Sequence, residues 1–217
     1  MRFISALLTI LSLAWIAPAA NAVPEPYQAG KHYLELPMPQ PVETGDKIEL
    51  REFFWYGCPH CFALEPSLNT YVKKLPANVR FVRTPGVGSN WMVQAQAYYT
   101  FEVLGVIDKV HGDFFKAWHV GNRHMNDMNS IAQFAVEHGV DKAKFIETSN
   151  SFGVRMRLEH AKDQNVKFMI DSVPMLVVDG RYLTSPGLAG SEKAAFEVVD
   201  FLIKKAASER KTSVPKK

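Results

Sequence analysis

The sequence predicts an α/β fold, in which a central mixed sheet is flanked by helices and carries an all-helical insertion at about residues 89–157. Segments with the composition of strands lie on both sides of that insertion, at 48–54 and 79–82 before it and at 175–178 after it. Within the insertion, apolar side chains recur every three or four residues, as in helices that pack on one side. Asp179-Gly180 is the strongest hairpin signal in the chain and is expected to join the last two strands.

The N-terminus has the three parts of a secretory signal peptide. Arg2 supplies a positive charge, residues 3–17 are mostly apolar, and Ala20-Asn21-Ala22 has the small-x-small pattern of a cleavage site. A membrane-spanning helix needs about 20 apolar residues, more than this run offers. We therefore expect an exported protein, cleaved near Ala22, rather than a membrane anchor.

A strand and a helix meet at the motif Cys58-Pro59-His60-Cys61. The β-rich run 48–54 leads directly into the motif, and the apolar residues after it fall on one side of a helix. Proline is favoured at the first helical position, because its missing N–H would have no partner there. We therefore expect Cys58 to cap this helix and Pro59 to begin it.

The helical block is predicted to contain four helices, followed by a longer fifth one. The first covers about 92–103, and Asp108, Ser130 and Asp141 are placed to cap the next three. The fifth runs from about 152 to 165. Behind the hairpin turn we expect a short strand and a last helix.

The short strand is expected at 181–183, and Ser191 is placed to cap the last helix. The order of elements divides the chain into a signal peptide at 1–22, a first part of the sheet domain at 23–88, the helical insertion at 89–157, a second part of the sheet domain at 158–210 and a basic flexible tail at 211–217.

The net charge of +3 comes from a basic C-terminus. Six basic residues there are opposed only by Glu209: Lys204, Lys205, Arg210, Lys211, Lys216 and Lys217. A basic tail can bind nucleic acid or anionic lipid. In an exported chain we interpret it as a solvated end, and we expect no nucleic acid partner.

Both cysteines of the chain lie in the motif. A structural disulfide framework uses more cysteines and longer loops, and structural zinc needs four ligands, for which no second cysteine pair exists. A Cys-x-x-Cys pair that follows a strand and opens a helix is typical of redox chemistry. Zinc binding and an inert disulfide remain the alternatives.

The helix N-terminus explains why such a pair is reactive. The N–H groups of His60 and Cys61 point at the capping side chain, which is the sulfur of Cys58, and the helix dipole favours its thiolate. Cys61, three residues on, lies on the same helical face. A stabilised thiolate makes the disulfide a stronger oxidant, so the sequence favours a donor of disulfides over a reductase.

The segment from Glu52 to Cys61, EFFWYGCPHC, resembles the active-site segment of the DsbA family of periplasmic dithiol oxidases. Val173-Pro174, ahead of a strand, is similar to the cis-proline loop of the thioredoxin superfamily, and the helical block is similar to the family's inserted domain. The resemblance covers residues 27–208. It implies a thioredoxin-like fold, a periplasmic location and chemistry without a metal or organic cofactor.

The resemblance also implies the roles of single residues. Cys58 would be the exposed sulfur that forms a mixed disulfide with the substrate, and Cys61 its buried partner. Pro59 and His60 would tune the thiolate. Pro174 would be cis and lie against the disulfide, while Val173 would offer backbone groups to an extended substrate.

Three further residues have weaker assignments. Glu52 matches the family's buried acid, a proton acceptor for Cys61; the alternative is an ordinary strand charge. Trp55 and Tyr56 are candidates for the substrate surface, and plain packing explains them equally well. The chain lacks the second cysteine pair of many family members, and its loop at 85–90 is its own, so the shape of the substrate groove does not follow from the resemblance.

The resemblance implies a monomeric oxidase of unfolded or reduced exported proteins, reoxidised by a DsbB-type membrane oxidase. An isomerase is the first alternative, but the segment between Ala22 and Cys58 is too short for a separate dimerisation domain. A binding module with a structural disulfide and a periplasmic reductase are the others.

Overall fold

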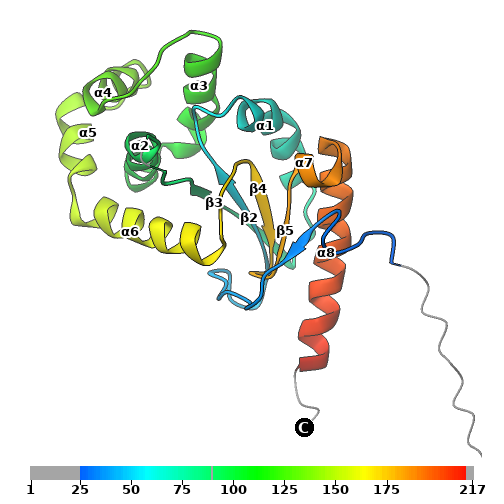
Figure 1. Ribbon diagram of the computed structural model, residues 1–217. Coiled ribbons are helices and arrows are strands. Elements are labelled where there is room, and N and C mark those ends of the chain that lie inside the picture. The colour runs from blue at the N-terminus through cyan, green and yellow to red at the C-terminus, as the bar shows by residue number, and fades with distance from the viewer. Residues whose placement is uncertain (1–24, 89, 214–217) are drawn as a thin grey trace, which may run out of the picture.

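A five-stranded mixed sheet forms the centre of the computed structural model, which describes residues 25–88 and 90–213 (Figure 1). Its strand order is β1-β5-β4-β2-β3, and only β2 and β3 pair in parallel. The strands are β1 (Leu34–Glu35), β2 (Ile48–Phe54), β3 (Val79–Pro85), β4 (Met175–Val178) and β5 (Tyr182–Thr184). The predicted signal peptide and the last four residues of the predicted tail lie outside the described residues.

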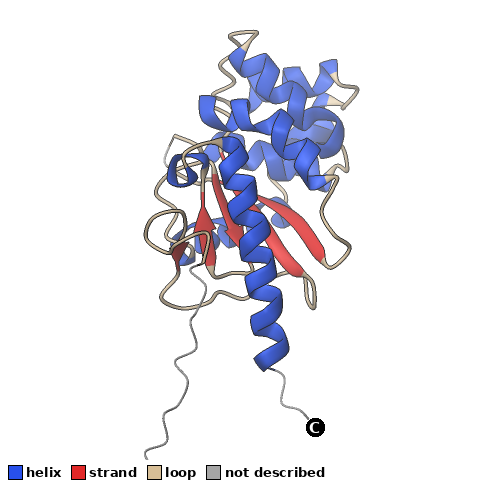
Figure 2. Cartoon of the chain, turned by 90° about the vertical axis from the view of Figure 1, so that its right-hand side faces the viewer, coloured by secondary structure: helices blue, strands red, loops and turns tan. Residues whose placement is uncertain are grey.

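Helices cover the sheet on both sides. The helices are α1 (Pro59–Val72), α2 (Met92–Val103), α3 (Ile107–His119), α4 (Met128–Glu137), α5 (Lys142–Ser149), α6 (Phe152–Lys167), α7 (Pro186–Ala189) and α8 (Glu192–Ser213). In Figure 2, α8 crosses one face of the sheet and the helical block gathers beyond one end of the strands. α6 runs on the side of the sheet opposite α8 (Figure 1). No helix among the described residues is long and apolar enough to cross a membrane.

The register of β2 places the predicted active-site residues together. β2 ends at Phe54, four residues before Cys58, and Phe53 pairs with Met175 at the start of the antiparallel β4. The segment Val173-Pro174, directly before β4, therefore lies at the same edge of the sheet as the motif. One apolar core occupies the helical block and includes Phe54 and both cysteines, so the motif lies at the junction of the sheet and the block.

Most predicted elements are confirmed, and the corrections concern helix caps and short elements. Asp108 lies in the first turn of α3, whose cap is Val106. Asp127 rather than Ser130 caps α4, because its side chain accepts the N–H groups of both Asn129 and Ser130. Asp141 and Ser191 do cap their helices.

Two elements were not predicted, and one was predicted too short. β1 has two residues and α7 four, too few to show a period. α8 extends to Ser213, so residues 211–213 of the predicted tail are helical. α6 runs without interruption across position 157, where we expected the insertion to end.

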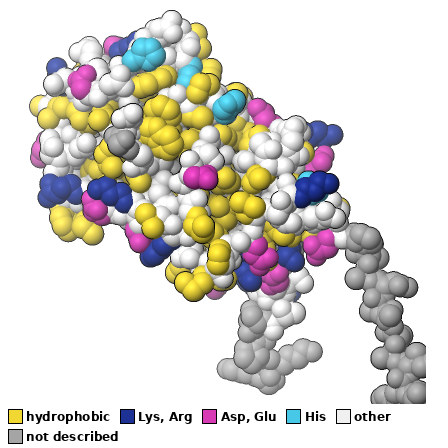
Figure 3. Space-filling view, viewed as in Figure 1, with side chains coloured by type: hydrophobic (Ala, Val, Ile, Leu, Met, Phe, Trp, Pro, Cys, Tyr) yellow, Lys and Arg dark blue, Asp and Glu magenta, His cyan; other side chains and the backbone are white. Residues whose placement is uncertain are grey.

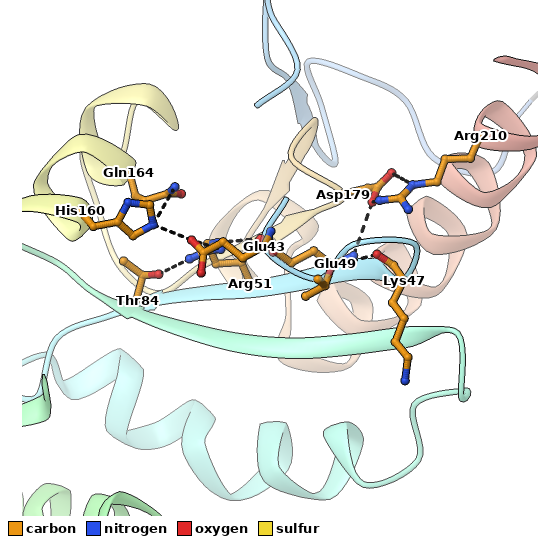
Figure 4. Close-up of polar contacts among 10 residues, drawn as sticks. Glu43, Lys47, Glu49, Arg51, Thr84, His160, Gln164, Asp179 and Arg210 are labelled. Carbon is orange, nitrogen blue, oxygen red and sulfur yellow. Dashed lines mark hydrogen bonds and ion pairs between the residues drawn. The ribbon is translucent and has the colours of Figure 1, made fainter. Parts of the chain in front are cut away.

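β2 is buried along its whole length, and its charged residues are paired. Arg51 is 2% exposed; its Nε lies 2.8 Å from Glu49 Oε1, and its guanidinium also contacts Glu43 and Thr84 (Figure 4). Glu43 in turn contacts His160 of α6 at 2.7 Å. We call Glu43, Glu49, Arg51, Thr84 and His160 the basal network. It joins the loop before β2 to β3 and α6, and its β2 members are Glu49 near the start of the strand and Arg51 in the middle.

Candidate active site

The motif opens α1 as the sequence predicts. Cys58 is the N-cap, in an extended conformation, and Pro59 is the first helical residue. The Cys58 N–H donates to the carbonyl of Trp55 at 3.0 Å, which closes a tight turn ahead of the helix. Gly57 in this turn must be a glycine, since a Cβ there would lie 2.3 Å from the Trp55 ring. The strand, the turn and the proline thus place the Cys58 sulfur at the helix N-terminus.

The two cysteines are free thiols that differ in access to solvent. Cys58 is 7% exposed and Cys61 is 0% exposed. The expectation that Cys58 is openly exposed is therefore corrected: the carbonyl of Val173 lies 3.4 Å from its Sγ and shields it. Cys58 is still the cysteine that an incoming sulfur can reach, because Cys61 has no exposed surface.

The surroundings displace the two thiol pKa values in opposite directions. The pKa of Cys58 is lowered to about 6, and the largest cause is a hydrogen bond from Cys61. The N–H groups of Cys61 and His60 and the charge of His60 also lower this pKa, whereas burial opposes the shift. Burial, and then the hydrogen bond to Cys58, raise the pKa of Cys61. At neutral pH Cys58 is therefore the thiolate and nucleophile, and Cys61 is the protonated partner.

Glu52 lies within the sheet beneath the motif. It is 1% exposed, and its carboxylate accepts a bond from Arg83 Nε at 2.9 Å. Burial raises the pKa of Glu52 to about 7, although Arg83 opposes the shift and Glu65 adds to it. The negative charge of Glu52 also contributes to the raised pKa of Cys61. An acid that titrates near neutrality so close to Cys61 has the properties of a proton acceptor, although its role remains a prediction.

The predicted cis-proline loop lies against the motif. The peptide bond between Val173 and Pro174 is cis, as the family resemblance implies, and the Val173 carbonyl contacts Cys58. A hollow of about 290 Å³ is lined by residues of the first turns of α1, of this loop, of α7 with its cap, and of the start of α8: His60, Ala63, Ser172, Val173, Pro174, Ser185, Pro186, Gly187 and Glu192. We call it the Pro174 groove. Substrate binding at this groove remains a prediction.

Trp55 and Tyr56 have different surroundings. Trp55 is half-buried, stacks on Trp91 with ring centroids 5.0 Å apart, and donates its Nε1–H to Gln94. Tyr56 is 1% exposed and its hydroxyl contacts His111. The prediction that Tyr56 borders the substrate surface is wrong, because a helix from the insertion covers it. A substrate contact of Trp55 remains a prediction.

Two residues of the site were missed by the sequence reasoning. Arg83 pairs directly with Glu52 in the register of β2 and β3, and its NH2 group lies 3.2 Å from Glu65 Oε2. Glu65 stands four residues after Cys61 and so lies on the same face of α1. That spacing could have identified Glu65, whereas Arg83 required knowledge of the strand register.

Comparison with known proteins agrees with this geometry. Residues 86–196 match the family model of the DSBA-like thioredoxin domain. The chain is 40% identical over 203 residues to the thiol:disulfide interchange protein DsbA of Pseudomonas aeruginosa, which covers 93% of this chain and 94% of that protein. It is 37% identical over 189 residues to DsbA of Bordetella pertussis, covering 86% and 88%.

Solved structures show the same fold. The crystal structure of Pseudomonas aeruginosa DsbA aligns with a TM-score of 0.82 and 41% identity, covering 85% of this chain and 97% of that one. The oxidoreductase DsbA from Xylella fastidiosa aligns with a TM-score of 0.79 and 29% identity, covering 84% and 98%. The alignments span both the sheet and the helical block. This chain therefore belongs to the DsbA family of thiol:disulfide interchange proteins, with a thioredoxin-like fold and a reactive cysteine pair at Cys58 and Cys61.

Proposed function

We propose that this protein is a periplasmic dithiol oxidase that introduces disulfide bonds into exported proteins. The observation that carries the proposal is the position of Cys58 at the N-terminus of α1, three residues before the buried Cys61, where the pKa of Cys58 is lowered to about 6 and that of Cys61 is raised. A stabilised Cys58 thiolate favours the reduced protein, so the Cys58–Cys61 disulfide readily accepts electrons. This is the property that a donor of disulfides needs.

The reaction proceeds by two exchanges. A substrate thiolate attacks Cys58 Sγ of the disulfide, the Cys58–Cys61 bond breaks, and Cys61 leaves as a thiolate and takes up a proton. A second substrate thiolate then attacks the substrate sulfur of the mixed disulfide, and Cys58 leaves as a thiolate. The substrate loses two electrons and gains a disulfide, while the protein becomes a dithiol. Glu52, with a pKa of about 7, serves Cys61 as the nearby proton donor and acceptor.

The substrate is held beside the motif. The backbone of Val173 offers its polar groups to an extended chain, the Pro174 groove receives the neighbouring residues, and Trp55 borders the same surface. Hydrophobic side chains also lie exposed across the centre of the face shown in Figure 3. Such a surface suits an unfolded or reduced protein, because that protein exposes apolar residues of its own.

The remaining parts of the proposal concern the cellular setting. The signal peptide at 1–22 directs export, and cleavage near Ala22 leaves a monomer with its helical insertion at 89–157. A DsbB-type membrane oxidase takes two electrons from the dithiol and restores the disulfide. No metal or organic cofactor takes part, since the two sulfurs carry the electrons.

The direct test is the variant Cys58→Ser in an assay that follows oxidation of a reduced substrate protein. We expect complete loss of oxidation, because no other sulfur in the chain can form the mixed disulfide with Cys61 buried. Retained oxidation would contradict the mechanism.

The reduction potential separates the oxidase from the other functions. We expect the wild type, equilibrated with glutathione, to have a potential well above the glutathione couple. A value below about −300 mV is typical of structural disulfides and would instead indicate a binding module.

A further inference from the structure

α3 of the helical block contacts Tyr56 at both of its polar ends. His111 Nδ1 lies 2.7 Å from the Tyr56 hydroxyl, and His119 Nε2 lies 2.8 Å from the Tyr56 carbonyl oxygen. α3 lies beside α1 in the structure (Figure 1). Tyr56 stands two residues before Cys58, so the insertion holds the chain directly ahead of the reactive sulfur.

The acceptors define which nitrogen carries each proton. A carbonyl oxygen only accepts hydrogen bonds, so His119 donates its Nε2–H to Tyr56. Burial lowers the pKa of His111, and its Nε2 lies 3.4 Å from the Glu65 carboxylate, so we place the single proton of the neutral ring on that nitrogen. The Nδ1 of His111 is then an acceptor, and the Tyr56 hydroxyl donates to it. Each contact is therefore directional, and each sets the position of one end of the tyrosine.

Both contacts lie in packed surroundings. Tyr56 is 1% exposed and His111 5% exposed, and the Tyr56 ring packs on Phe114 of α3 with centroids 4.3 Å apart. The His119 ring stacks on Phe62, the residue after Cys61, at 4.7 Å and 11°. Since buried polar groups keep their partners, α3 fixes the chain on both sides of the motif.

The segment that α3 holds determines the position of the Cys58 sulfur. Tyr56 lies inside the turn that the Cys58 N–H closes onto the Trp55 carbonyl at 3.0 Å. A shift of that turn would move the Cys58 sulfur away from the N–H groups of His60 and Cys61, which favour its thiolate, and this electrostatic effect weakens as the groups separate.

We propose that His111 and His119 are positioning residues of the redox site, which hold Tyr56 at its hydroxyl and its carbonyl and thereby keep the Cys58 sulfur against the helix N-terminus. The proposal rests on the proposed function, in which the substrate attacks Cys58 and Cys58 then leaves as a stabilised thiolate. It assigns to the helical block a part in setting the redox properties of the motif, in addition to covering it.

The test uses Tyr56→Phe, which removes one hydroxyl and keeps the ring, and His119→Leu, which removes the donor to the carbonyl. We expect each to raise the pKa of Cys58, followed by thiolate absorbance, and to stabilise the disulfide about three- to tenfold against glutathione. His119→Gln keeps an N–H donor and should recover most of the wild-type value. Adding His111→Gln to Tyr56→Phe should cause little further change, because the shared bond is already lost.

Thr100→Val is the matched control. It removes another buried hydroxyl of the helical block, which donates to the Gln96 carbonyl at 2.7 Å on α2, and it should lower stability without changing the exchange equilibrium. Circular dichroism confirms that each variant is folded. An equilibrium constant in Tyr56→Phe and His119→Leu equal to that of Thr100→Val would overturn the inference. A wild type that fails to oxidise substrates would instead overturn the proposed function.

Discussion

The two ends of β2 each bury a glutamate, and the two glutamates are paired differently. Glu49 and Glu52 are both 1% exposed. Glu49, at the end remote from the motif, accepts bonds from Arg51 Nε and from the backbone N–H of Glu43, both at 2.8 Å. Glu52, at the motif end, accepts one bond among the described residues, from Arg83, which also contacts Glu65; Arg51 is likewise shared, with Glu43. Burial is equal, so the difference between the two sites lies in the number of partners.

This difference separates a structural acid from a functional one. The backbone N–H of Glu43 gives Glu49 a second donor, and this bond ties the loop before β2 to the strand. Glu52 has only the Arg83 bond among the described residues, and burial raises its pKa to about 7. Glu52 can therefore exchange protons at neutral pH, whereas the basal network joins the strand to α6 and β3.

The largest expected effect comes from breaking the basal network with Arg51→Met. This change leaves Glu49 buried without its cation, which should lower the free energy of unfolding by about 3–5 kcal/mol. Urea unfolding measures the loss. Oxidation of substrate by the folded protein should be unchanged, because the network lies away from the cysteines.

Arg157→Met provides the control for that experiment. Arg157 pairs with Glu102 at 2.8 Å, but its side chain is 50% exposed, so the loss should stay below about 1 kcal/mol. Equal losses in the two variants would mean that burial adds nothing to the basal network.

Two isosteric changes, Glu49→Gln and Glu52→Gln, should change the free energy of unfolding at pH 7.5 in opposite directions. Glu49→Gln weakens charge-assisted bonds and should lower stability by about 1–3 kcal/mol at pH 7.5. The folded protein binds the Glu52 proton more tightly than the unfolded chain, since the pKa rises from 4.5 to about 7. Stability conferred by that proton is present at low pH and is lost as the pH rises through this range.

Because glutamine does not ionise, Glu52→Gln removes the loss of stability that the wild type shows as the pH rises. Relative to the wild type, the variant should gain about 2 kcal/mol between pH 5 and pH 7.5, measured by urea unfolding at both values. A variant that is destabilised as much as Glu49→Gln would show that Glu52 is ionised and fully paired, and the contrast between the two ends of β2 would disappear.

The contrast also shows what local sequence patterns can predict. The cap at Cys58 and the first helical proline follow from neighbours in the chain, and both were predicted. The hairpin at Asp179-Gly180 was predicted for the same reason, since both residues have the positive φ that this turn requires. Such features depend on a few adjacent residues, whose chemistry is visible in the sequence.

Features that depend on distant partners were missed. The pairing of Glu52 with Arg83 depends on strand register, and the burial of Tyr56 depends on His111, 55 positions away. β1 has only two residues and gains its order from pairing with β5. Local patterns therefore predict the reactive sulfurs, whereas the contacts of Arg83 and Tyr56 depend on how distant segments pack together.

The smallest expected effect comes from changing His60. This change separates the contribution of the His60 side chain to the stability of the Cys58 thiolate from that of the backbone N–H groups. The positive charge of His60 lowers the pKa of Cys58 less than the Cys61 hydrogen bond and the backbone N–H groups do, and the side chain is exposed, so solvent ions screen it. His60→Ser should therefore raise that pKa by less than about one unit. The pH dependence of Cys58 alkylation by iodoacetamide measures it: the rate should rise through about pH 6 in the wild type and at slightly higher pH in the variant. A much larger shift would mean that the exposed His60 side chain, rather than the buried helix N-terminus, stabilises the Cys58 thiolate. The motif would then depend on a single charge, whereas the basal network depends on several contacts.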